Sequence, residues 1–62
     1  MLEKYKKENH LTNKALAEML GVTQITVWRI LNEHRVGRKS IEAMSKLLNV
    51  EEIEIYKYYK SR

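Results

Sequence analysis

The spacing of Ala17, Gly21 and Val27 constrains the fold of this chain more than any other feature of the sequence. Two short helices that cross at a steep angle need a small residue where they touch, and Ala17 meets that need. The corner between the helices needs a residue that tolerates a positive φ angle, which Gly21 does without strain. Val27 can then pack the second helix against the first. The A-x3-G-x5-V pattern within residues 12–31 therefore predicts a helix-turn-helix.

Length and composition exclude several classes of protein. A chain of 62 residues is expected to form one domain, residues 1–62, without room for an effector pocket or a catalytic domain. Cysteine is absent, and His10 and His34 lack an acidic pair at ligand spacing, so we expect surface histidines and neither a metal site nor a catalytic dyad. We expect no enzyme, no cofactor and no small-molecule effector. Because the sequence contains neither a secretory leader nor an apolar run of about 18 residues, we expect a cytoplasmic protein.

The charges of the chain are unevenly distributed. Twelve Lys and Arg against eight Asp and Glu give a net charge of +4, which suits a polyanionic partner. Basic residues dominate between positions 29 and 46, whereas Glu51, Glu52 and Glu54 form an acidic patch directly afterwards. One end of the molecule is therefore expected to face an anion.

Apolar periodicity and capping residues predict an all-α bundle of four to five helices. The hydroxyls of Thr12 and Thr23 can accept hydrogen bonds from free backbone N–H groups, so both are expected N-caps. Residues 33–37 break the periodicity and are predicted to form a loop. The predicted helices span residues 1–9, 13–20, 24 to about 32, and 38 or 40 to 49. The predicted core residues are Leu2, Tyr5, Leu16, Ala17, Leu20, Val27, Ile30, Leu31, Ile41, Met44, Leu47 and Leu48.

The C-terminal segment from residue 50 to residue 59 allows two interpretations. The spacing of Ile53, Tyr56 and Lys60 fits a helix, whereas Ile53, Ile55 and the tyrosines fit an edge strand. We favour a fifth helix and keep the strand as the alternative.

The outward face of the predicted third helix carries side chains with direct uses in the DNA major groove. Arginine can bind guanine O6 and N7, glutamine can pair with adenine, and an isoleucine or threonine methyl can pack on a thymine methyl. Trp28 is expected to lie either against DNA or folded back over the first helix. The alternative is that these are ordinary solvated helix residues. The predicted base-contacting residues are Gln24, Ile25, Thr26, Trp28 and Arg29, with Arg29 the first choice.

Polar and basic residues flank this helix on both sides, where phosphate contacts would position it without reading sequence. The loop after the helix would come alongside a DNA strand when the helix docks; the alternative is a solvated basic loop. The predicted phosphate-contacting residues are Thr12, Asn13, Thr23, Asn32, His34, Arg35, Arg38 and Lys39.

The segment LTNKALAEMLGVTQITVWRILNE resembles the DNA-binding domain of the Cro and phage-repressor (XRE) family, and KLLNV resembles the usual end of its next helix. This likeness covers residues 2–50. TVWRILNEHRV is similar to the recognition helix and turn of LacI-type repressors, of the same lambda-repressor-like class. Both resemblances imply sequence-specific binding of double-stranded DNA, base readers at Gln24, Ile25 and Arg29, and backbone contacts in the following loop. Glu33 departs from both families, which often carry glycine there.

The sequence thus predicts a small transcriptional regulator, and by family analogy a Cro-like repressor that occupies an operator. The alternatives are a protein-interaction module, such as an antirepressor or antitoxin partner, and a nonspecific DNA binder. A homodimer on a palindromic operator is expected. On a fifth helix Ile55, Tyr58 and Tyr59 would project away from Ile53 and Tyr56, and could either form the dimer surface or cover the first helix.

Overall fold

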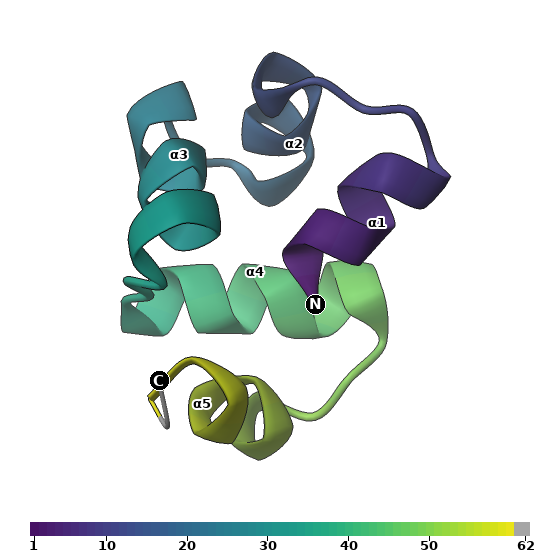
Figure 1. Ribbon diagram of the computed structural model, residues 1–62. Helices are drawn as coiled ribbons and strands as arrows, with labels where there is room; N and C mark the ends of the chain where they lie inside the picture. The colour runs from purple at the N-terminus through teal and green to yellow at the C-terminus, as the bar shows by residue number, and fades with distance from the viewer. Residues whose placement is uncertain (61–62) are drawn as a thin grey trace.

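The computed structural model describes residues 1–60, and over that range the chain forms α-helices joined by short turns, without a strand (Figure 1). The all-α prediction is confirmed, and the C-terminal segment is helical. The last two residues of the predicted domain lie outside the described residues. The helices are α1 (Leu2–Glu8), α2 (Asn13–Leu20), α3 (Gln24–Glu33), α4 (Arg38–Leu48) and α5 (Glu52–Lys60).

Threonine caps and a left-handed glycine define the ends of α2 and α3. Thr12 Oγ1 accepts a hydrogen bond from Ala15 N at 3.0 Å, and Thr23 Oγ1 accepts one from Thr26 N at 3.2 Å. Both predicted N-caps are therefore confirmed. Gly21 ends α2 with φ 70° and ψ 33°, a conformation that costs glycine little and other residues more.

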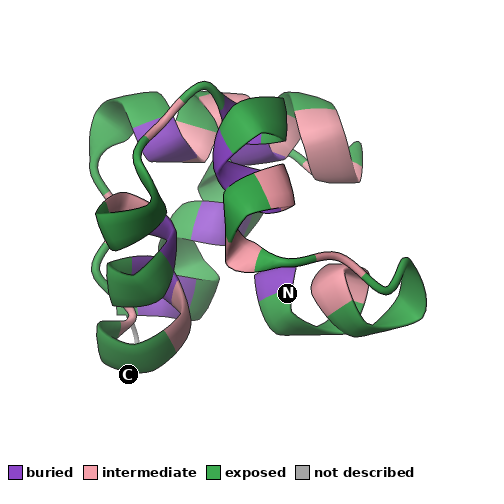
Figure 2. Ribbon diagram, turned by 90° about the horizontal axis from the view of Figure 1, so that it is seen from above, coloured by how far each residue is buried: buried purple, intermediate pink, exposed green. Residues whose placement is uncertain are grey.

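The core gathers where the helices face one another, and Figure 2 shows the buried segments turned toward the interior. In Figure 1, α4 crosses the middle of the molecule, with α1, α2 and α3 on one side and α5 on the other. Ala17 and Val27 are both buried, as the helix-turn-helix pattern requires. The buried apolar residues are Leu2, Leu16, Ala17, Leu20, Val27, Ile30, Met44, Ile55 and Tyr59.

The predicted core was partly wrong along α4. Met44 is fully buried, but Ile41, Leu47 and Leu48 are only half-buried, and Ser40 is buried in their place. The helix begins at Arg38, the earlier of the two predicted starts, after Gly37 in an extended conformation. This earlier start places Ser40 inside the first turn of the helix, four residues before Met44 on the same inward face.

Of the two roles predicted for Ile55 and Tyr59, the structure supports the one in which this face of α5 packs inward and covers α1. Ile55 and Tyr59, four residues apart, point into the core and are 0% and 2% exposed. The Tyr59 hydroxyl accepts a hydrogen bond from Leu2 N at 3.3 Å, so this tyrosine covers the start of α1. The large apolar side chains that α5 leaves exposed are Ile53, Tyr56 and Tyr58.

His34 also departs from its predicted surface position. It ends α3 in a left-handed conformation, φ 54°, one residue after Glu33, which stays helical. Its ring is half-buried and lies 5.6 Å from the ring of Tyr59. The buried Nδ1 atom has no hydrogen-bond partner within residues 1–60. The turn after α3 is thereby packed against α5, whereas His10 is exposed as predicted.

Candidate nucleic-acid interface

The outward face of α3 carries one continuous strip of exposed side chains. Gln24 and Arg29 are exposed, and so are two large apolar residues between them, Ile25 at 64% and Trp28 at 49%. Trp28 therefore does not fold back over α1, which was one of its two predicted positions. An isoleucine and a tryptophan three residues apart on an otherwise polar helix face expose apolar area that a partner could cover.

The opposite side of α3 fixes the helix in place. Val27 and Ile30 are fully buried, so the helix is held in the core along one side while the strip faces outward. The hydroxyls of Thr23 and Thr26 lie 3.0 Å apart and share a hydrogen bond. Thr26 is half-buried, the only one of the five predicted base-contacting residues that is not exposed.

One flank of α3 brings together residues from three helices. Asn13 at the start of α2 and Asn32 near the end of α3 line the same hollow. The Oδ1 atom of Asn13 is buried and has no hydrogen-bond partner within the described part of the chain, whereas Asn32 Nδ2 donates to Trp28 O at 3.0 Å. The hydroxyl of Thr12, next to Asn13, is engaged in capping α2.

Basic residues of α1 and the following turn border this hollow too, and the sequence analysis missed them. Lys6, Lys7 and His10 line it, together with one acidic residue, Glu3. Their place at the end of α1, directly before the turn that leads to Asn13, was the available signal. Its meaning depended on how α1 packs against α3, which periodicity does not give.

On the other flank of α3, the predicted phosphate-contacting residues do not all lie on one surface. Arg35 lines the same hollow as Arg29, so these two residues border one surface. Arg38 and Lys39 are exposed but line two other hollows, one between α4 and α5 and one beside α2. No side chain caps α4 at Gly37, so the first backbone N–H groups of this helix are free to donate to an anion.

A helix-turn-helix family model matches residues 2–55 of the chain, from α1 into the first turn of α5. The chain belongs to the Cro and phage-repressor (XRE) family. The predicted lambda-repressor-like resemblance is confirmed, and the match extends five residues beyond the likeness read from the sequence. No match was found among curated proteins or among solved structures.

The members of the XRE family share a general activity. The family consists of DNA-binding transcription regulators that are generally not enzymes. Residues 1–60 contain no cluster of His, Asp and Glu side chains able to hold a metal ion. None of the helices within that range is long and apolar enough to cross a membrane.

Proposed function

We propose that this XRE-family protein is a Cro-like repressor that binds a specific sequence in double-stranded DNA through the major groove and represses by occupying an operator. The observation that carries the proposal is the exposed strip of α3. It combines hydrogen-bonding side chains, Gln24 and Arg29, with apolar side chains, Ile25 and Trp28, on a helix whose other side is buried. A rigid helix with such a strip suits the width and chemistry of the major groove.

Each residue of the strip has a proposed role. Arg29 binds O6 and N7 of a guanine, and Gln24 pairs with an adenine. Ile25 packs on a thymine methyl, and Trp28 covers the edge of the contact beside the sugar-phosphate backbone. Thr26, half-buried beside Thr23, contributes its methyl at the entrance of the helix.

The two flanks of α3 are proposed to hold the DNA backbone. On one side the hollow with Asn13 and Asn32 is bordered by Lys6 and Lys7. On the other side Arg35 and the free N–H groups at the start of α4 face the next phosphates. Contacts on both sides fix the position of the helix along the groove, and the strip then reads the bases.

Two copies are proposed to bind one palindromic operator. The Cα trace measures 25 × 21 × 18 Å, so one copy is too short to reach two half-sites that lie 34–36 Å apart on the same side of the duplex. Two copies related by a two-fold axis can reach both.

The test of this proposal is selection of bound sequences from a random duplex pool at physiological salt. We expect a palindromic consensus. On the selected duplex, Arg29→Ala should weaken binding by about 1–3 kcal/mol and relax the preference at one base pair per half-site, because a guanine contact is lost. The matched control is Lys57→Ala, which removes the same charge from exposed α5, outside the proposed interface. Absence of any preferred sequence, or equal losses for the two variants, would contradict the proposal.

A further inference from the structure

The turn after α3 is built on a histidine, whereas the turns after α2 and α4 are built on smaller residues. Gly21 and Asn49 end those two helices in the left-handed conformation, with φ 70° and 56°. His34 takes the same conformation, φ 54°, at the end of α3. Glycine and asparagine are the usual residues at such a position, so the turn does not need the ring of His34. The contacts of the ring therefore indicate what it adds.

The hydrogen bond that closes this turn joins the backbone of Arg35 to that of Arg29. Arg35 N–H donates to Arg29 O at 3.3 Å, which is longer than most N–H to carbonyl bonds. The turn is also one residue wider than the turn after α4, where Val50 N–H donates to Ser45 O at 3.2 Å. The bond alone therefore holds Arg35 loosely, and packing of its neighbours is needed to fix it.

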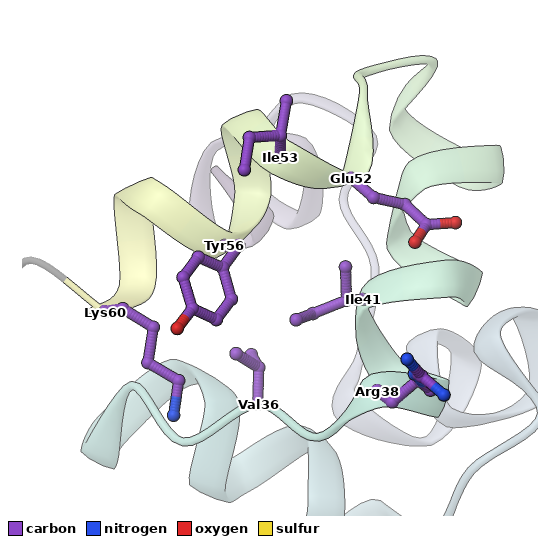
Figure 3. A pocket seen from close by; sticks show the side chains of 7 residues that line it. All are labelled: Val36, Arg38, Ile41, Glu52, Ile53, Tyr56 and Lys60. Carbon is purple, nitrogen blue, oxygen red and sulfur yellow. The ribbon is translucent and has the colours of Figure 1, made fainter.

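The residues on both sides of Arg35 pack against α5. The ring of His34 lies 5.6 Å from the ring of Tyr59, which is itself only 2% exposed. Val36 lines the hollow between α4 and α5, and Figure 3 shows its side chain and that of Tyr56 directed toward the same space. The loop is thus fastened to α5 immediately before and immediately after Arg35.

The inward position of His34 separates it from the surface that Arg35 borders. Its Nδ1 atom is buried without a hydrogen-bond partner in the part of the chain that the structure describes, so its contact with Tyr59 is one of packing. Arg35 lines the hollow that Arg29 also lines, and His34 is not part of that lining. His34 therefore lies behind this flank of α3 rather than on it.

We propose that His34 is a positioning residue for DNA binding, whose ring, packed on Tyr59, holds Arg35 in place to bind a phosphate. This inference rests on the proposed function and gives α5, which lies outside the proposed interface, a part in binding. It replaces the phosphate contact that the sequence predicted for His34 itself. A side chain whose backbone is already fixed loses less conformational entropy on binding, so its contact with the phosphate is stronger.

The first experiment is a double-mutant cycle of His34→Asn and Arg35→Ala, measured by titration of selected and scrambled duplexes at several salt concentrations. Asparagine forms the same left-handed turn at Asn49, so the substitution removes the ring and keeps the turn. We expect His34→Asn to weaken binding to all duplexes about fivefold, but by less than about twofold when Arg35 is already alanine. The salt slope should fall by up to about 0.9 in His34→Asn and no further in the double variant than in Arg35→Ala.

A second variant, His34→Phe, keeps a ring at this position and removes both nitrogens. Because Nδ1 has no partner among the described residues, phenylalanine should restore most of the affinity and of the salt slope that asparagine loses. The left-handed conformation costs phenylalanine more than histidine, so the melting temperature is measured alongside. Leu48→Ala is the control for lost stability and should leave the salt slope native, since half-buried Leu48 lines a hollow with residues of α1.

Amide hydrogen exchange of the free protein tests the same contact without DNA. The bond to Arg29 O protects the Arg35 N–H, and loss of the ring should loosen this turn. We expect exchange at Arg35 to become about tenfold faster in His34→Asn and to stay near the native rate in His34→Phe. The Val50 N–H, which closes the turn after α4, is the internal reference and should not change.

The outcomes separate this inference from the proposed function. Faster exchange at Arg35, with coupled losses on scrambled DNA, supports the role of His34 even if no preferred sequence is found. Additive losses in the cycle, or a phenylalanine variant as weak as the asparagine variant, would assign His34 a contact of its own with DNA. Either result, or native affinity in His34→Asn, overturns the inference and leaves the repressor in place.

Discussion

Tyr59 connects three parts of the fold through a single side chain. Its hydroxyl accepts the Leu2 N–H at the start of α1, and its ring lies beside His34 at the end of α3. Burial raises the pKa of this hydroxyl above the usual value of 10.0; the hydrogen bond from Leu2 lowers it by less, and the carboxylate of Glu3 adds to the rise. The folded protein therefore retains the Tyr59 proton to higher pH than the unfolded chain does.

This pKa difference predicts that the protein loses stability in alkaline solution. Below about pH 10 both states hold the proton, and the contribution of Tyr59 to the free energy of unfolding is complete. Above that pH the unfolded chain releases the proton first, so the free energy of unfolding falls as pH rises. Urea denaturation at a series of pH values from about 8 to about 11 measures how the free energy of unfolding changes with pH.

Substitution of Tyr59 by phenylalanine tests the origin of this slope. Tyr59→Phe should lower stability at neutral pH by about 1 kcal/mol, because Leu2 N–H loses its acceptor, and should flatten the alkaline loss. Tyr56→Phe, at an exposed tyrosine, should keep the native slope. An unchanged slope in Tyr59→Phe would assign the alkaline loss to other groups, such as the lysines.

At the scale of helices, the sequence predicted the elements well because their signals are local. The two N-caps and the corner between α2 and α3 could be predicted from residue type alone, because Thr12, Thr23 and Gly21 each act within one turn of their own position. The buried face of α5 did not follow, because Ile53 with Tyr56 and Ile55 with Tyr59 are equally apolar pairs at helical spacing. The buried face is identified by the burial of Ile55 and by the contacts of Tyr59 with Leu2 and His34, which join distant parts of the chain.

The two glycines provide a test of the corner between α2 and α3. Apart from the adjacent residues, no atom lies within 4 Å of where a Cβ would lie at Gly21 or Gly37, so an added Cβ meets no clash at either position. Gly21 has φ 70°, and Gly21→Ser should therefore cost about 1–2 kcal/mol of backbone strain. Gly37 is the extended N-cap of α4, and Gly37→Ser should be neutral or slightly stabilising, since its hydroxyl can cap the helix.

Thermal unfolding of the two serine variants compares these costs directly. The same side chain is added in both, so the difference in melting temperature reports the backbone strain at Gly21 together with the capping gain at Gly37. Equal melting temperatures would mean that the corner does not require glycine.

At the scale of the whole molecule, the sequence predicted the exposed strip of α3 but not how the flanks are arranged. Exposure of Gln24, Ile25 and Arg29 follows from the period of one helix. Whether Arg35 or Arg38 shares a hollow with Arg29 depends on how the loop after α3 meets α4. In the structure Arg35 lines the same hollow as Arg29, whereas Arg38 lines the hollow between α4 and α5.

This arrangement predicts different consequences for Arg29 and Arg35, the two arginines of the proposed DNA-binding flank. Arg29→Ala should change the sequence preference, whereas Arg35→Ala should weaken binding to all duplexes alike, because a phosphate contact carries no base information. Each phosphate contact contributes about 0.9 to the slope of log affinity against log salt, so Arg35→Ala should reduce the magnitude of that slope by about this amount. Titrations of selected and scrambled duplexes at several salt concentrations measure both quantities. The control is Lys57→Ala, which removes the same charge from α5 and should leave the salt slope nearly native. If Lys57→Ala reduced the slope as much as Arg35→Ala does, net charge alone, rather than a contact beside α3, would determine the salt dependence.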